Sequence, residues 1–186
     1  YGTITDGIGF TRSLEEQGWL IKDKKITMVG AGGASTAIMV QLALDGVKEI
    51  IVYNRTMRTE FQEIINNTII ETGCTITLKS LSDLESLKKD MHSSYLFINT
   101  TGVGMEPMLE RSVVPDASYF KPDLKVADII YQPAVTKMLR LAKEAGCATM
   151  NGELMLLYQG VESFKIWTGQ EMPINEVKKV LGIEVK

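Results

Sequence analysis

The chain has 186 residues, which is enough for one hydrophobic core of ordinary domain size. Hydrophobic residues make up 45% and charged residues 23%, as in typical globular proteins, and the net charge of −3 gives no reason to expect nucleic acid or an anionic membrane as a partner. No apolar run approaches membrane-spanning length and the N-terminus does not resemble a signal peptide, so we expect a cytoplasmic protein.

The first residues have the character of a helix start. Asp6 could act as an N-cap, and Ile8, Phe10, Leu14 and Leu20 form a loose apolar stripe after it. Because the chain begins without methionine and its first residues look like the interior of a protein, we expect a further domain upstream. We predict a connecting helical segment at 1–21 and a separate domain at 22–186.

The stretch at 28–37, MVGAGGASTA, is the most informative in the chain. An apolar run at 26–29 precedes its glycines and a periodic apolar run follows, which predicts a strand, a glycine turn and a helix. Gly30 and Gly32 would let the backbone approach a pyrophosphate, which the free N–H groups of the next helix would bind. Ser35 stands where GxGxxG has its third glycine, and a purely structural turn would use similar residues.

The second predicted strand, at 50–53, ends in Asn54, Arg55 and Thr56. An NAD site would place an Asp or Glu here to bind the ribose 2′-hydroxyl, and neither is present. Arg55, with Arg58 nearby, offers cationic donors suited to a 2′-phosphate instead. A turn with a solvated arginine is the alternative, but the upstream glycine turn favours NADP over NAD.

Short apolar runs continue to alternate with helical patterns. The further strands and helices are predicted at these positions: strands at 75–78, 95–98, 126–130 and 148–150, and helices at 60–72, 81–91, 136–145, 154–167 and 174–181. Such alternation requires right-handed crossovers between parallel strands. We therefore predict an α/β, Rossmann-like doubly wound fold with a mainly parallel six-stranded sheet, order 3-2-1-4-5-6, and helices on both faces.

A few polar and sulfur-containing residues lie outside the glycine turn and the arginine segment. Thr100 follows the strand at 95–98, where open α/β sheets hold ligands, although turn chemistry explains it equally well. His92, the single histidine, receives no role. Cys74 and Cys147 lack metal-ligand spacing, so we expect buried reduced thiols and no metal site.

Six motifs in this order resemble the shikimate dehydrogenase family, most closely its quinate/shikimate dehydrogenase branch. They are Thr5–Asp6–Gly7–Ile8–Gly9–Phe10, Gly30–Ala31–Gly32–Gly33–Ala34, Asn54–Arg55–Thr56, Val103–Gly104–Met105, Asp128–Ile129–Ile130–Tyr131–Gln132–Pro133 and Gly152–Glu153–Leu154–Met155–Leu156–Leu157–Tyr158–Gln159. The resemblance spans nearly the whole chain. It implies NADPH-dependent, reversible reduction of 3-dehydroshikimate to shikimate, a step toward chorismate and the aromatic amino acids, with quinate or NAD used by some members.

The resemblance also implies that this chain is the NAD(P)-binding domain of a two-domain enzyme. An upstream substrate domain would carry a catalytic lysine, so the fragment would bind nucleotide yet be inactive alone. The sequence does not determine the oligomeric state, and a homodimer is one candidate.

Carried over residue by residue, the resemblance assigns roles as follows. Asp6 would contact the substrate hydroxyl and take part in proton transfer, and Tyr131 and Gln159 would contact substrate. The cofactor contacts would come from Gly30, Ala31, Gly32, Gly33, Ala34, Asn54, Arg55, Thr56, Arg58, Thr100, Ile129 and Gly152. Without the resemblance, Tyr131 could be a packed aromatic and Gln159 a solvated helix residue.

Two positions depart from the family's pattern: Ile4 stands where it has asparagine, and Thr59 where it has a further arginine. Two other functions remain open. One is a nucleotide-binding module without catalysis, and the other is a methylene-tetrahydrofolate dehydrogenase, against which the motif at 152–159 argues.

Overall fold

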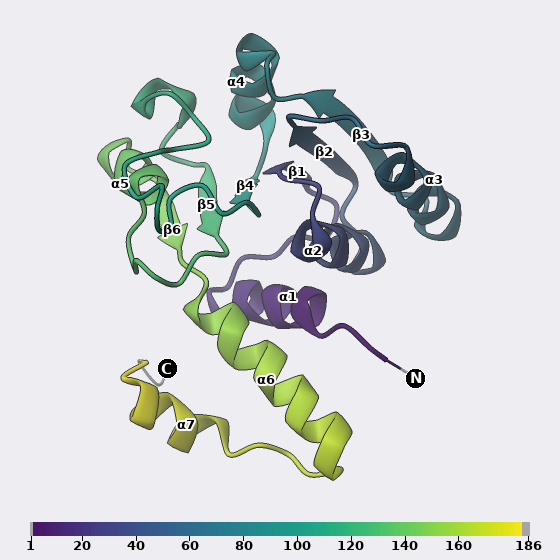
Figure 1. Ribbon diagram of the computed structural model, residues 1–186, viewed down its shortest axis with the longest axis vertical. Coiled ribbons are helices and arrows are strands. Elements are labelled where there is room, and N and C mark those ends of the chain that lie inside the picture. Colours follow the sequence, from purple (N-terminus) through teal and green to yellow (C-terminus); the bar gives the residue numbers. More distant parts are fainter. Residues whose placement is uncertain (1, 184–186) are drawn as a thin grey trace.

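A six-stranded, all-parallel sheet forms the centre of the computed structural model, which describes residues 2–183 (Figure 1). Its strands in chain order are β1 Lys25–Val29, β2 Glu49–Asn54, β3 Thr75–Ser80, β4 Leu96–Asn99, β5 Lys125–Asp128 and β6 Ala148–Met150. The strand order is β3-β2-β1-β4-β5-β6, which confirms the predicted topology. None of the helices within 2–183 is both long enough and apolar enough to cross a membrane.

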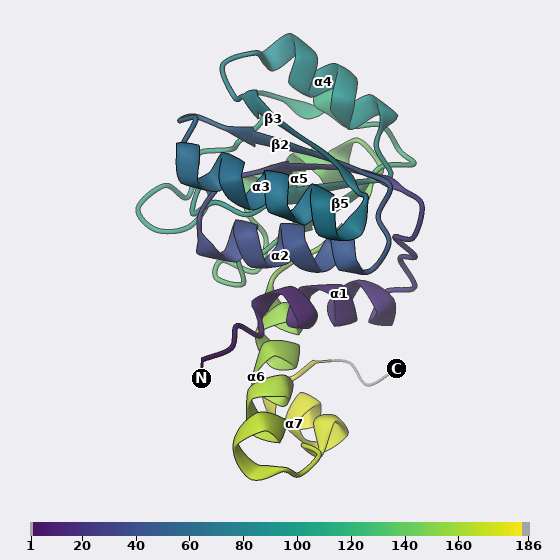
Figure 2. The same cartoon turned by 90° about the vertical axis from the view of Figure 1, so that its right-hand side faces the viewer.

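Helices cover both faces of this sheet (Figure 2). They are α1 Asp6–Glu16, α2 Gly33–Leu44, α3 Thr59–Thr72, α4 Leu84–Ser93, α5 Lys137–Glu144, α6 Glu153–Thr168 and α7 Ile174–Leu181, with one 3₁₀ turn, η1 Ala117–Tyr119. The hydrophobic cluster on one face draws on α1, α2 and α3, and the cluster on the other face on α4 and α5. Since successive residues of a strand point to opposite faces, this double cover explains why the central strands are apolar without alternation.

Strand β2 shows this directly. Ile50 and Val52 belong to the cluster under α2 and α3, whereas Ile51 and Tyr53 belong to the cluster under α4 and α5. Four methionines, Met28, Met39, Met138 and Met155, are buried in the core. Cys74 and Cys147 are buried and form no disulfide.

Several local predictions differ from the structure. Ile8 and Leu20 are exposed: α1 buries only Phe10 and Leu14 of the predicted stripe, and Leu20 lies beyond the end of the helix at Glu16. The N-cap of α1 is Thr5, and Asp6 is the first helical residue. Helix α4 begins at Leu84 rather than at 81, because the side chain of Asp83 accepts a hydrogen bond from the Ser86 N–H.

Helix α1 lies between α2 and α6, and two of its glycines bring its backbone directly against these helices. A Cβ on Gly7 would lie 2.5 Å from the carbonyl oxygen of Ala37 in α2. A Cβ on Gly9 would lie 2.6 Å from the backbone nitrogen of Gln159 in α6. The two glycines therefore hold α1 closely against both helices, and they fix where its first residue, Asp6, is placed.

We predict that Gly9→Ala lowers the free energy of unfolding by about 1–3 kcal/mol, because the new methyl group meets rigid backbone of α6. Urea denaturation measures this change. Gly160→Ala is the matched control, since Gly160 lies inside α6 with no atom near its Cβ position. That control should be neutral or stabilising by about 0.5–1 kcal/mol. Unchanged stability of Gly9→Ala would contradict the close contact between α1 and α6.

Candidate functional site

Three of the predicted cofactor residues lie side by side at the carboxyl edge of the sheet. Gly30, Thr100 and Ile129 each follow directly after a strand, namely β1, β4 and β5. Their N–H groups continue the ladder, donating to Tyr53 O at 2.8 Å, Val29 O at 2.9 Å and Asn99 O at 3.1 Å respectively. Strand β1 has β2 on one side and β4 on the other, so the chain leaves β1 and β4 in opposite directions. This divergence creates the crevice in which open α/β sheets bind ligands.

Gly30 and Thr100 approach closely at this point. Gly30 has a φ of +124°, and a Cβ there would lie 2.4 Å from the hydroxyl oxygen of Thr100. That hydroxyl donates a hydrogen bond to Val29 O at 2.7 Å. Thr100 therefore joins β4 to β1 through its side chain, a structural role beside the cofactor contact that the sequence predicts.

Neither close packing nor backbone conformation requires glycine at the next two positions, Gly32 and Gly33. A Cβ on Gly32 or Gly33 would find no atom within 4 Å, and neither residue has a positive φ. Gly32 is the N-cap of α2 and makes no side-chain cap, so the first turn of α2 presents backbone N–H groups to the crevice. Bare backbone facing open space at a helix N-terminus is suited to a phosphate group that approaches closely. Ala31, Gly32 and Gly33 line a cavity there, and Ala34 lies in the first turn of α2.

Ser35 explains the incomplete glycine motif. Its side chain is fully buried and its hydroxyl donates to Gly30 O at 2.6 Å. The residue that departs from GxGxxG thus closes the turn by a hydrogen bond. The departure is visible in the sequence, but the hydrogen bond that gives Ser35 this role is visible only in the structure.

The two arginines line different cavities. Arg58 lines a cavity of about 620 Å³ together with Gly32, Gly33 and Thr36. Arg55 lines a second cavity, of about 570 Å³, between Asn54 and the loop after β4. The Asn54 side chain donates to Thr56 O at 2.6 Å and so stabilises the turn that carries Arg55. Both guanidinium groups are exposed and available to an anionic ligand.

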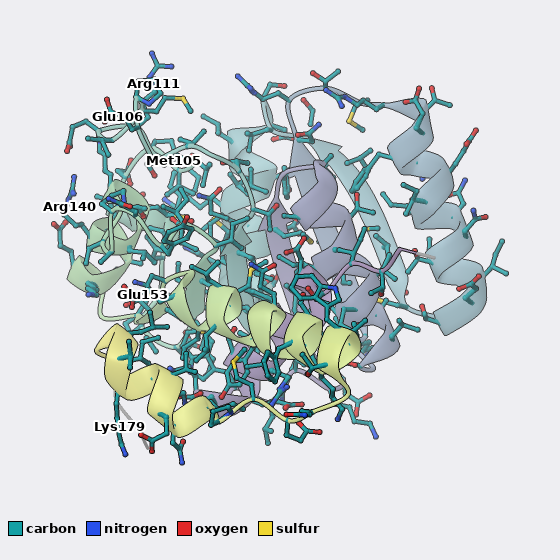
Figure 3. All side chains as sticks on the ribbon, turned by 60° about the horizontal axis from the view of Figure 1, so that its bottom comes forward. Met105, Glu106, Arg111, Arg140, Glu153 and Lys179 are labelled. Carbon is teal, nitrogen blue, oxygen red and sulfur yellow. The ribbon has the colours of Figure 1, made fainter. Side chains whose placement is uncertain are left out.

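The largest cavity, of about 750 Å³, lies between the loops that follow β4 and β5. Its walls include Thr100, Met105, Ile129 and Tyr131, and Tyr131 is 49% exposed. Figure 3 shows Met105, Glu106 and Arg111 on the loop after β4, far from Lys179 on α7. The size and the mainly apolar walls suit a flat ring with one polar edge.

Asp128 ends β5 as a fully buried carboxylate, and the structure ends this strand two residues earlier than the sequence predicts. The reason is local: Asp128 Oδ1 accepts a hydrogen bond from the Ile130 N–H at 3.1 Å and turns the chain. Burial raises the pKa of Asp128 to about 6, and hydrogen bonds from Thr136, Ile130 and Asn99 oppose this rise.

Gly152 brings the start of α6 against the turn after β5. A Cβ on Gly152 would lie 2.0 Å from Ile129 O, and the Gly152 N–H donates to Ile130 O at 3.0 Å. The start of α6 therefore lies directly beside the turn that carries Ile129 and Tyr131.

The predicted substrate residues occupy two places. Gln159 packs its backbone against Gly9 of α1, and Thr5, next to Asp6, shares a hydrogen bond of 3.2 Å with Ser163 of α6. Asp6 and Gln159 are thus brought onto adjoining helices, both half-buried. Tyr131 belongs to the large cavity near the start of α6, and none of the interactions described for 2–183 joins it directly to either residue.

Comparison with known proteins supports a single family. A model of shikimate/quinate 5-dehydrogenases matches residues 13–139, and a model of the C-terminal domain of shikimate 5′-dehydrogenase matches residues 152–181. A shikimate dehydrogenase (NADP(+)) of Listeria innocua is 44% identical over 184 residues, covering 97% of this chain and 62% of the relative. The chain thus spans less than two thirds of the length of that curated relative.

Solved structures agree with this relationship. Shikimate 5-dehydrogenase from Listeria monocytogenes, in complex with shikimate and NAD, superposes with a TM-score of 0.91 at 44% identity, covering 97% of this chain and 63% of that one. Quinate dehydrogenase from Corynebacterium glutamicum, in complex with NAD, gives 0.83 at 27% identity, covering 97% and 62%. With a family model matched over most of its length, the chain belongs to the shikimate/quinate 5-dehydrogenase family.

Proposed function

We propose that this chain is the dinucleotide-binding domain of an NADP-dependent shikimate dehydrogenase, which reversibly reduces 3-dehydroshikimate to shikimate. The observation that carries the proposal is the bare backbone at Gly32 and Gly33, with Arg58 lining the same cavity and Arg55 following directly after β2 at the same edge of the sheet. The name of the Listeria innocua relative supports NADP as the cofactor. Quinate as substrate and NAD as cofactor are the alternatives, and the Corynebacterium glutamicum relative favours them.

The residues fit such a dinucleotide from end to end. Arg55 and Arg58 would bind the 2′-phosphate, the first turn of α2 the pyrophosphate, and the cavity beside Ile129 the nicotinamide ring. When bound, that ring supplies the hydride. Asp6, held by Gly7 against α2, would hold the substrate hydroxyl and help move its proton.

We propose further that the substrate side is completed by a domain outside this sequence, with residues 1–21 as the connection and 22–186 as the nucleotide domain. The length of the curated relative, of which this chain covers 62%, supports this division. On this proposal the chain alone binds nucleotide but does not turn over. A catalytically silent nucleotide-binding module is the second candidate, favoured by Ile4 in the segment before Asp6. A cytoplasmic location and a homodimer stay predictions from the sequence.

We predict that Gly33→Ala weakens NADPH binding about tenfold or more, because the new methyl group occupies the space that a phosphate needs. Its stability should stay equal or rise by about 0.5–1 kcal/mol, since Gly33 is the first residue of α2 and has no neighbour. Calorimetric titration and thermal unfolding measure the two quantities. Unchanged affinity in a folded Gly33→Ala protein would argue against a pyrophosphate at this turn.

For cofactor choice, Arg55→Ala should weaken NADPH binding about tenfold and leave NADH binding nearly unchanged, because a charge-assisted contact to the 2′-phosphate is lost. Parallel fluorescence titrations with the two nucleotides measure this. Lys48→Ala is a control of equal charge at the opposite, amino edge of the sheet, exposed like Arg55. If the unaltered chain binds NADPH no more tightly than NADH, the assignment to Arg55 is wrong.

Catalysis is tested in the longer protein that contains both domains. Asp6→Asn should lower kcat for shikimate oxidation about 10²–10⁴-fold with little change in NADP affinity, because only the proton-transfer group is altered. Asp45→Asn, at the far end of α2, serves as the control. Rapid shikimate oxidation by residues 1–186 alone would contradict the proposal that a further domain completes the site. An inactive longer protein would favour the nucleotide-binding module without catalysis.

A further inference from the structure

The walls of the largest cavity are held in place by a buried polar network that does not itself reach the cavity. Asp128, Asn99 and Thr136 are each fully buried, and none of them lines the cavity. Every residue that does line it comes from the loop after β4 or the loop after β5. These three side chains lie where the two loops begin and where the second one ends.

Asp128 is the centre of the network. Its Oδ1 accepts hydrogen bonds from the Asn99 side-chain amide at 3.0 Å and from the Ile130 N–H at 3.1 Å. Its Oδ2 accepts a hydrogen bond from the Thr136 hydroxyl at 2.8 Å. One carboxylate thus ties together the end of β4, the turn after β5 and the start of α5.

Asn99 carries the connection into the other wall. Its Oδ1 accepts from both the N–H and the hydroxyl of Thr101, at 3.1 and 2.7 Å, and its amide also donates to Val103 O at 3.2 Å. Because its amide faces Asp128 and its carbonyl faces Thr101, its orientation is set by both partners. The loop after β4 therefore follows the position of Asp128.

Thr136 closes the network from the other end. It is the N-cap of α5, and the methyl and Cβ of its side chain lie 3.2 Å from where a Cβ of Gly104 would be. The loop after β4 is thus packed against the residue that Asp128 holds. Polar bonds on one side and close packing on the other leave neither wall free to move independently.

We propose that Asp128 is a positioning residue, which sets the spacing of the two loops so that the cavity admits the nicotinamide ring. The inference rests on the proposed function, because it takes the cavity as the nicotinamide end of the dinucleotide site. A carboxylate suits the position because all three of its neighbours are donors. Asp128 acts through the loops and touches neither cofactor nor substrate.

The test separates the two ends of the dinucleotide. NADPH reaches both the arginines and the cavity, whereas 2′,5′-ADP carries only the adenosine half. In Asp128→Ala we expect NADPH affinity to fall about tenfold or more and 2′,5′-ADP affinity to change less than about twofold. Asp128→Asn should restore most of the loss, because its carbonyl can keep the bonds of Oδ1 while its amide donates to Thr136.

Two further variants keep the test decisive. Thr136→Val removes one hydrogen bond at nearly constant shape and should give a smaller loss in the same direction, even if Asp128→Ala does not fold. Met91→Ala, in the core under α4, lowers stability without touching the network and should leave the ratio of the two affinities unchanged.

Some outcomes would contradict the role of Asp128, and one would contradict the proposed function itself. Two results would mean that Asp128 contributes only to overall stability, and either would overturn the inference. One is an equal loss of both affinities in the folded Asp128 and Thr136 variants. The other is a similar change in the ratio of the two affinities in Met91→Ala. Equal affinity of the unaltered chain for both probes would overturn it too, because the cavity would then add nothing to binding. Binding of neither probe would instead refute the proposed function, on which the inference depends.

Discussion

The close approach of Gly30 to Thr100 is the contact on which the site depends. It occurs where β1 and β4 are neighbours and their chains diverge, and only a residue without Cβ allows the Thr100 hydroxyl to reach Val29 O. Continuous parallel pairing on both sides of β1 requires this contact, because the ladder extends through Gly30 on one side and Thr100 on the other. Binding groups from separate segments are thereby placed along one edge of the sheet.

Backbone contact also relates the catalytic candidates to this edge. Gly7 and Gly9 let α1 touch α2 and α6 without intervening side chains, so small changes in α1 would move Asp6 relative to both helices. Gly152 does the same for α6 and the turn at Ile129. The glycines at 7, 9 and 152 allow close packing, whereas those at 32 and 33 leave bare backbone. Gly32 and Gly33 are expected to matter for binding with little effect on stability.

Much of the fold was predictable because its signals are local. Apolar runs buried on both faces, helix stops such as Gly73 and the glycine turn are all readable within a few residues. Errors arose where a side chain acts at a distance of two or three residues, as Asp83 does at the start of α4 and Asp128 at the end of β5. The predicted apolar stripe wrongly includes Leu20, which is exposed. Helical periodicity does not predict burial for an apolar residue beyond the end of a helix.

The amino-acid sequence by itself determined the alternation of strands and helices, the family and the kinds of residue that could hold a dinucleotide. Periodicity over a few residues suffices for the alternation of strands and helices. Short motifs and their order along the chain suffice for the family and for the binding residues. Only the tertiary structure decided that Arg55 and Arg58 line different cavities, that Ser35 closes the glycine turn, and that Asp128, Asn99 and Thr136 form one network. The network joins residues up to 29 positions apart, Asn99 and Asp128, and forms only when parallel strands bring their carboxyl ends to a common edge.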